Sequence, residues 1–294
     1  MNWKIEDRVV HKNKPEWGVG KVLHANSQEV DVFFVNAGRK TLSQPAALLE
    51  AAPAPMHAHP LLLNLASAML HDSSRFLPLP DCIQYFLKLF PQGFDDPTYL
   101  SPGLDGGERQ YKLVASTYVK EVLGESEWRS LADAGNHAEI CLRLARIESK
   151  TNLLHSFEKI KWHAALKDAR LQKGLADAFF NDLFGTDSRM AGFAILADAL
   201  GAAEGCSKWT IATYYGFLMH PESRIFIKPE VTKFAAQACG WDLQYDSALN
   251  WNTLARAERM AQHLFDELQR IGLKPRDMID AQSFIWCIDP KSYA

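Results

Sequence analysis

The chain has no apolar run long enough to cross a bilayer. A spanning helix needs about 18 or more consecutive apolar residues, and none occurs in the 294 residues. The first residues, MNWKIEDRVV, also lack the apolar core of a secretory signal peptide. We therefore expect a cytoplasmic protein with no membrane partner.

Cysteine is scarce and scattered. The cysteines are odd in number and form no CxxC pair, the spacing that is typical of zinc and redox sites. We expect reduced, mostly buried thiols and no metal site. The five are Cys82, Cys141, Cys206, Cys239 and Cys287.

Several catalytic motifs are missing as well. The sequence contains no GxSxG, no GxxxxGK[ST], no HExxH and no HxE…CxxC pattern. These absences argue against a hydrolase nucleophile elbow, P-loop nucleotide binding and zinc deaminase chemistry. We expect no cofactor. The net charge of −3 excludes little, because a local basic face can exist on an acidic protein.

The composition is that of a globular protein. Hydrophobic residues make up 47% of the chain, aromatic residues 11% and charged residues 23%, which is enough apolar material for a buried core. The length fits one large domain or two ordinary ones.

The first 50 residues are typical of a small β-domain. RVVH, GVGKVLHA, EVDVFFV and RKTL are each of strand length, and they are separated by turn residues. Glycines on both sides of Val19 allow a tight bend, and Asn36-Ala37-Gly38 predicts a hairpin turn. We predict a strongly bent β-barrel over residues 1–50.

The motifs of this segment are DRVVH (7–11), WGVGKV (17–22) and VFF (32–34) followed by AGRK (37–40). They resemble the Tudor-like or SH3-like barrels that include the C-terminal module of UvrD-type helicases and the CarD-type polymerase-interacting domain. The resemblance implies contact with RNA polymerase, a helicase or nucleic acid; the alternative is a barrel that only caps the larger domain. The candidate nucleic-acid-binding residues here are Lys12, Lys14, Trp17, Arg39 and Lys40.

Residues 51–60, AAPAPMHAHP, form a Pro/Ala-rich segment without helical or strand periodicity. Such composition predicts a semi-rigid spacer. His57 and His59 lie within it, but no third ligand accompanies them, so we interpret them as solvent-exposed residues rather than a metal site.

From residue 61 to 294 apolar residues recur at intervals of three and four, which predicts helices. No repeat of solenoid length occurs. We therefore predict an α+β protein: a small N-terminal all-β barrel, a linker and a large all-α domain. The helical segments are expected at 61–71, 81–90, 108–124, 137–149, 152–168, 175–185, after Arg189, after Lys208, at 252–272 and at 275–288.

Residues 205–240 carry a second resemblance. GCSKWTIA (205–212), IKPEVTKF (227–234) and ACG (238–240) resemble the hairpin, the following apolar segment and the helix end of helix-hairpin-helix DNA glycosylases of the endonuclease III superfamily. The resemblance implies a nucleophilic lysine at Lys208. It departs from the family at Lys228, which stands where those enzymes have a catalytic aspartate, and the hairpin lacks the family's first glycine.

Lys228 lies in a short apolar run, RIFIKPEV, directly before a proline that favours an extended backbone. Alternation places Ile225 and Ile227 on one side and Phe226 and Lys228 on the other, which favours a lysine at the mouth of a cleft. A desolvated lysine amine is a nucleophile that forms Schiff bases. Alternatively it stays charged and grips a phosphate or the carboxylate of Glu230.

Two segments are locally basic. Residues 208–233 hold four Lys or Arg against two acidic residues, and residues 147–173 hold six against three. A helix beginning at Ser207, with Ser207 as its N-cap, would present backbone N–H groups to a phosphate. The alternative is that these lysines are ordinary solvated residues. The candidate DNA-binding residues are Ser207, Thr210, Arg224, Lys233, Lys159, Lys161 and Trp162.

Trp162 lies on the helix predicted at 152–168. We expect Phe157, Ile160, Ala164 and Ala165 to form the buried face of this helix, and Trp162 either to stack on a base or to belong to the core.

Taken together, these patterns predict a DNA-binding protein, and more specifically a divergent glycosylase or lyase. It would act on a flipped base in DNA repair or defence, with Lys228 or Lys208 as the reacting amine. The alternative is a non-catalytic module that binds a polymerase or a helicase. DNA is the partner that we expect, although no residue pattern in the sequence discriminates against RNA.

Overall fold

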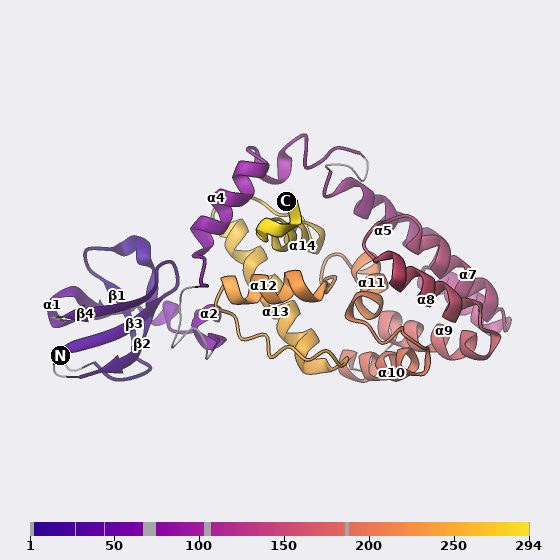
Figure 1. Cartoon of the computed structure of the whole chain (residues 1–294), viewed down its shortest axis with the longest axis horizontal. Coiled ribbons are helices and arrows are strands. Elements are labelled where there is room, and N and C mark those ends of the chain that lie inside the picture. Colours follow the sequence, from indigo (N-terminus) through magenta and orange to yellow (C-terminus); the bar gives the residue numbers. More distant parts are fainter. Residues whose placement is uncertain are drawn as a thin grey trace. The chain divides into compact units, whose positions relative to one another are not determined.

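The computed structural model describes residues 3–26, 28–43, 45–66, 75–102, 107–185 and 188–293 (Figure 1). The chain has an α+β fold with a small N-terminal β-domain followed by a larger helical part, as the sequence predicts. It forms two compact units. The first contains residues 1–89, 233–243 and 287–294, and the second contains residues 90–232 and 244–286.

The first unit is built around one antiparallel sheet in the order β4-β3-β2-β1-β5. The turn from β3 to β4 falls at the predicted Asn36-Ala37-Gly38, and Gly38 adopts a positive φ of 66° that glycine accommodates without strain. The strands are β1 (Arg8–His11), β2 (Val19–Ala25), β3 (Glu29–Phe34), β4 (Gly38–Ser43) and β5 (Leu49–Ala51).

Strand β3 is buried on both faces, because its apolar side chains alternate between two clusters. Val32 and Phe34 belong to one cluster, with Val9, Val22, Val30, Leu42 and Leu49. Phe33 and Val35 belong to the other, with Val19, Ala52, Leu61, Leu62 and Phe76. Through Leu61, Leu62 and Phe76, the second cluster joins the sheet to the chain that follows it. The described α-helices of this unit outside the shared boundaries are α1 (Pro45–Leu48), α2 (Pro60–Leu63) and α4 (Leu79–Leu89).

In the segment predicted as a spacer, residues 51–60, Ala51 and Ala52 belong to this sheet and its core, whereas residues 53–58 are exposed. Ala51 pairs with Val9, and Ala52 is buried. An imidazole nitrogen of His57 lies 2.8 Å from the carbonyl oxygen of Ala52, to which it can donate a hydrogen bond. The prolines therefore shape a turn on the unit's surface. Of the helix predicted at 61–71, the structure places Pro60–Leu63 in α2, and residues 67–71 lie outside the described residues.

The second unit is helical. Its helices α7, α8 and α9 lie side by side, and α9 and α10 pack against each other (Figure 1). The sequence analysis missed α6, which is short and mostly polar. The helices are α5 (Gln110–Leu123), α6 (Glu125–Asp133), α7 (His137–Glu148), α8 (Ser156–Lys167), α9 (Ala169–Phe184), α10 (Arg189–Ala202), α11 (Trp209–Met219) and α13 (Trp251–Arg270). Two of the four boundaries between the units fall inside helices, namely α12 (Pro229–Ala238) and α14 (Met278–Cys287).

Helix α11 is the centre of the second unit, since every one of its residues is buried. It packs against α5, α9 and α10. Its sequence, WTIATYYGFLM, contains no charged residue, and its hydroxyls are satisfied inside the unit. The Tyr215 hydroxyl accepts a hydrogen bond from Trp162 Nε1 at 2.7 Å and donates one to the Leu144 carbonyl at 2.9 Å.

The expected buried face of α8 was wrong at Phe157, Ile160 and Ala164, which are exposed, and right at Ala165. Phe157 and Ile160 are 74% and 64% exposed, whereas Trp162, Ala165 and Leu166 are buried. The buried stripe therefore follows Trp162 at intervals of three and four, which rotates the helix away from the face that its first apolar residues indicate. No helix among the described residues is long and apolar enough to span a membrane.

Candidate functional site

A pocket of about 120 Å³ opens in the second unit. Four stretches of chain meet there: the start of α5 with the loop before it, the loop between α7 and α8, the extended segment before α12, and α14. The volume suits a small molecule or a single planar ring, and it is below the roughly 300 Å³ at which drug-sized pockets begin. The lining residues are Gly107, Glu108, Tyr111, Lys112, Asn152, Leu153, Phe226, Lys228, Gln282 and Trp286.

The segment that carries Lys228 is extended, and its alternation is the one that the sequence predicts. Phe226 and Lys228 line the pocket, while Ile225 and Ile227 are buried in the core. The backbone N–H of Ile227 donates a hydrogen bond to Thr213 Oγ1 on α11 at 2.9 Å. This bond fastens the segment to the central helix just before Pro229 begins α12.

The Lys228 amine lies 4.0 Å from the centroid of the Trp286 ring. Within the described parts of the chain, the amine forms no hydrogen bond or ion pair. Burial lowers its pKa, and the nearby Lys112 ammonium adds to this effect, while the carboxylates of Glu158 and Glu108 oppose it. The amine is therefore more readily deprotonated than an exposed lysine, which is the condition for a nucleophilic amine.

One wall of the pocket is a charged pair. The buried Lys112 Nζ donates hydrogen bonds to Glu108 Oε2 and to Ser283 Oγ, each at 3.0 Å. The same Nζ lies 5.2 Å from the centroid of the Tyr111 ring. Tyr111, Phe226 and Trp286 give the pocket aromatic surface from three different elements.

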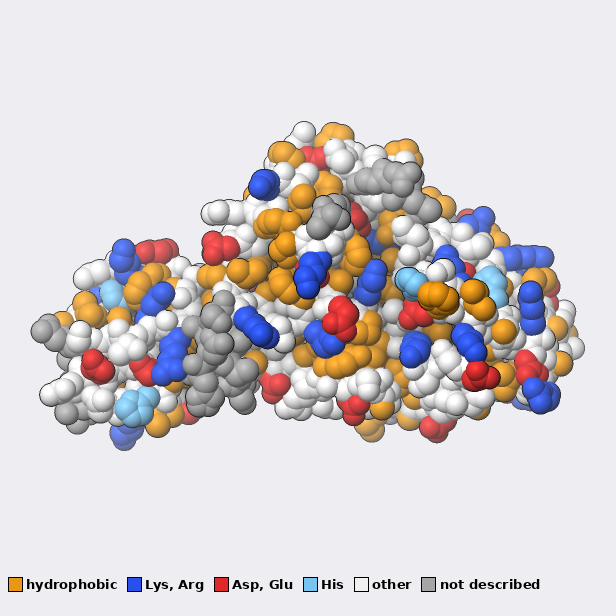
Figure 2. Space-filling view, viewed as in Figure 1, with side chains coloured by type: hydrophobic (Ala, Val, Ile, Leu, Met, Phe, Trp, Pro, Cys, Tyr) orange, Lys and Arg blue, Asp and Glu red, His pale blue; other side chains and the backbone are white. Residues whose placement is uncertain are grey.

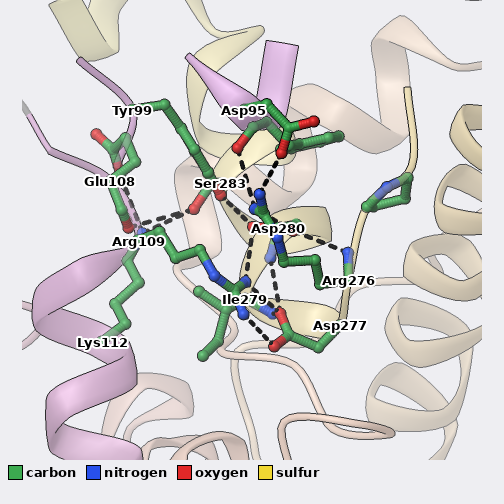
Figure 3. A network of polar contacts seen from close by, with 12 residues as sticks. Asp95, Tyr99, Glu108, Arg109, Lys112, Arg276, Asp277, Ile279, Asp280 and Ser283 are labelled. Carbon is green, nitrogen blue, oxygen red and sulfur yellow. Dashed lines mark hydrogen bonds and ion pairs between the residues drawn. The ribbon is translucent and has the colours of Figure 1, made fainter. Parts of the chain in front are cut away.

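Behind this wall a polar network holds α14 against the loop that precedes α5 (Figure 3). The Arg109 guanidinium donates to both carboxylate oxygens of Asp277, at 2.8 and 2.7 Å, and to Asp280 at 2.7 Å. The Tyr99 hydroxyl donates to the same Asp280 oxygen at 2.5 Å, and Arg276 pairs with the other Asp280 oxygen. Burial, and after it the Asp280 carboxylate, raises the pKa of Tyr99. The network fixes the helix that carries Gln282 and Trp286.

Sequence reasoning found Lys228 but missed the rest of the pocket. Gln282 and Trp286 are spaced as neighbours on one helix face, which is the one local signal that could have paired them. Glu108, Tyr111 and Lys112 lie more than a hundred residues away from Lys228 in the chain. Only the fold brings them to the same place.

Three predicted DNA-binding residues lie inside the unit. Arg224 is buried and donates to the side chain and the carbonyl of Asp182, at 2.7 and 2.5 Å. Thr210 is buried and donates to Glu158 Oε1 at 2.6 Å. Trp162 is fully buried, which agrees with the alternative that it belongs to the core. Their polar groups already have partners, so we assign them structural roles.

The predicted N-cap was wrong. Helix α11 begins at Trp209, and its N-cap residue is Lys208, which makes no side-chain capping bond. The Lys208 N–H instead donates to the Cys206 carbonyl at 2.8 Å, in the turn that follows Gly205 with its φ of 76°. Ser207 and Lys208 are exposed, and neither lines the pocket.

The other predicted lysines are mostly paired with acids. Lys159 Nζ lies 2.9 Å from Glu148 and Lys161 Nζ lies 2.6 Å from Glu204. Lys233, on α12, is partly exposed. On the face drawn in Figure 2, Lys and Arg side chains lie singly among acidic and hydrophobic ones, with no continuous basic area.

In the β-domain, Lys12 and Lys14 are exposed, and Lys14 lies 3.8 Å from Glu16. The Trp17 ring packs on His11 and Phe34, with ring centroids 4.8 and 5.2 Å apart. The remaining two candidates also have neighbours: Lys40 Nζ lies 5.6 Å from the Trp17 centroid, and Arg39 pairs with Asp31 at 2.5 Å.

In the described portions of the chain, no group of three or more His, Cys, Asp or Glu side chains is placed to hold a metal ion. All five cysteines lie among the described residues; each is buried and none forms a disulfide bond.

In the comparison with known protein families, a model described as "Protein of unknown function (DUF3553)" matches residues 7–52. The match coincides with the β-domain and extends one residue past β5. No curated protein and no solved structure matches the chain.

Proposed function

We propose that the Lys228 pocket receives a nucleobase rotated out of a DNA strand, and that the Lys228 amine reacts at the sugar carbon C1′ as in a DNA glycosylase or lyase. The observation that carries the proposal is the Lys228 amine itself. It has no hydrogen-bond partner in the described residues, lies 4.0 Å from the Trp286 ring centroid and has a pKa lowered by burial. Flipped bases are held in other enzymes by aromatic stacking, and this pocket presents three aromatic rings.

The chemistry follows from the neutral amine. At an abasic site, Nζ forms a bond to the aldehyde carbon C1′. The carbonyl oxygen then leaves as water, taking one hydrogen from the amine and one proton from solvent, and a protonated imine remains. With a base still attached, the same nitrogen displaces it from C1′. The electron pair of the broken bond goes to the base, which takes up a proton.

The two candidate amines have different surroundings. Lys228 lines the pocket and is partly desolvated, whereas Lys208 is exposed at the N-cap of α11 and lies outside the pocket lining. Lys228 is therefore the amine that we assign to the reaction.

Borohydride trapping tests the proposal. The full chain is incubated with DNA that contains one abasic site, and borohydride reduces any imine to a stable secondary amine. We expect a covalent protein–DNA adduct that disappears in Lys228→Ala and in Lys228→Arg, since arginine keeps the charge but is not a nucleophile at this pH. Lys208→Ala is the matched control and keeps the adduct.

Two results would contradict the proposal: no adduct with the unaltered chain, or an undiminished adduct in Lys228→Ala. Circular dichroism of each variant shows whether it is folded, and so distinguishes the loss of the amine from the loss of the folded structure.

A second candidate function is a non-catalytic module that binds polymerase or helicase through the β-domain. Its support is the resemblance of the β-domain motifs to polymerase- and helicase-interacting barrels; the family model that matches residues 7–52 is one of unknown function and adds no partner. Co-elution of the full chain with RNA polymerase, lost in Lys14→Glu while trapping persists, would support it. Failure to co-elute with RNA polymerase or a UvrD-type helicase would exclude those partners.

A further inference from the structure

The Gln282 side chain has an unused amide inside the pocket. It is 3% exposed, and it belongs to the pocket lining. Its Oε1 atom is buried without a hydrogen-bond partner, and the amide makes no hydrogen bond to any residue that the structure describes. Buried side-chain acceptors in native proteins are nearly always paired, so an orphaned one in a pocket calls for a donor from a ligand.

The amide is held on a rigid element. Gln282 and Trp286 are one helical turn apart on α14, so the amide and the indole ring face the same space. The next residue, Ser283, accepts a hydrogen bond from Lys112, and Asp277 and Asp280 anchor the same helix through Arg109 (Figure 3). A group fixed in this way recognises a ligand edge without first being ordered.

The pocket's chemistry restricts the ligand. Tyr111, Phe226 and Trp286 favour a planar ring. Lys112 and Lys228 disfavour a cation, because a positive ligand would meet two ammonium groups and one carboxylate, Glu108. The remaining requirement is an N–H donor for Gln282.

We propose that Gln282 determines the specificity of this pocket, by accepting a hydrogen bond from an N–H group on the edge of a neutral, planar nitrogen heterocycle. The proposal rests on the proposed function in one respect, since it identifies that heterocycle as a nucleobase. Bases that carry an exocyclic amino group or an imide N–H at this edge are bound, and bases in which that group is absent or methylated are rejected.

The test compares ligands that differ only in the donor. Calorimetric titration of the full chain uses 9-methyladenine against 9-methylpurine, and 1-methyluracil against 1,3-dimethyluracil, with the methyl group standing in for the sugar. A second arm places adenine or purine within a short single strand, which distinguishes a free base from one carried by DNA. The variants are Gln282→Leu and Gln282→Met, which remove the amide at similar size. Gln262→Leu is the control, the same change on the exposed face of α13.

In the unaltered chain we expect the donor-bearing member of at least one pair to bind about tenfold or more tightly, because an analogue without the donor leaves Gln282 unpaired. Gln282→Leu and Gln282→Met abolish this preference and do not lower the melting temperature, since they remove an unpaired buried group. Gln262→Leu keeps the preference.

Equal binding of both members by the unaltered chain, a preference that survives in both Gln282 variants, or no binding of any member in either arm would overturn the proposal. The outcome is separable from that of the trapping experiment. Donor-selective binding that depends on Gln282, in a chain that yields no borohydride adduct, supports the recognition role of Gln282 and refutes only the amine chemistry.

Discussion

The Lys228 amine and the Trp286 ring lie 4.0 Å apart, close enough for a cation–π contact. The contact favours the charged amine, yet burial lowers the pKa of Lys228 despite it. Trp286 thus offers its face to the ammonium, and a planar ligand would share that face. Occupation of the pocket and the charge of Lys228 are therefore expected to depend on each other.

The first prediction concerns pH. Folding lowers the pKa of Lys228 from the ordinary value of 10.5, so the charged form costs stability at pH values below the folded pKa. That cost disappears as the pH rises from the folded to the unfolded pKa, where the amine becomes neutral in both states. Lys228→Met should therefore raise the urea midpoint at pH 7, and the gain should shrink by pH 10. The same change at exposed Lys208 is the control, and a gain that grows with pH would refute the prediction.

The second prediction concerns the network behind the pocket. Asp280 is fully buried and accepts from Arg109 and Tyr99, whereas the Asp95 side chain is 75% exposed where it pairs with Arg276. Removing one partner of a buried ion pair leaves an uncompensated charge, so Asp280→Ala should cost about 3–5 kcal/mol in the free energy of unfolding. Asp95→Ala should cost less than about 1 kcal/mol. Equal costs in urea denaturation would contradict this assignment.

The third prediction concerns Gly20, a residue of β2 that has no room for a side chain. A Cβ atom at Gly20 would lie 2.5 Å from Val32 Cγ1 and 2.8 Å from the Phe34 ring. Both neighbours are fully buried, so Gly20→Ala should destabilise the protein by about 1–3 kcal/mol through overpacking. Gly174 on α9 has open space around it, and Gly174→Ala should stabilise by about 0.5–1 kcal/mol through helix propensity. Thermal unfolding checks both signs.

The fourth prediction separates two aromatic residues of α8. Trp162 is fully buried and bonded to Tyr215, so Trp162→Ala should cost about 3–5 kcal/mol or more. Phe157 is exposed, and Phe157→Ala should change stability by less than about 0.5 kcal/mol. If instead Trp162→Ala folded normally and lost only DNA binding, the base-stacking alternative would hold for Trp162.

Local patterns predicted β1 to β4 well, because their pairing is between neighbours in sequence, whereas β5 pairs with β1 from the other end of the domain. The alternation in β3 and the turn at Asn36-Ala37-Gly38 are visible in the residues themselves. The same holds for Lys228, whose orientation follows from alternation in a short extended segment.

Elsewhere tertiary packing decided the outcome. The sequence of α8 offers two apolar stripes, and contact with α7 and α9 buries the one that contains Trp162. Ser207 is a good capping residue, but the turn after Gly205 delays α11 by two residues. Three of the lysines that made residues 147–173 look basic, Lys159, Lys161 and Lys173, are paired with acids, two of which lie outside that segment.

Helix α11 has no face towards solvent. Its backbone amides can therefore exchange their hydrogens with water only when the second unit opens around them, and we expect them to be among the slowest to take up deuterium. The Ile227 amide, bonded to Thr213 on that helix, should share this protection. Lys228 thus follows directly after an amide that we expect to be protected, so this wall of the pocket should open only together with the centre of the second unit.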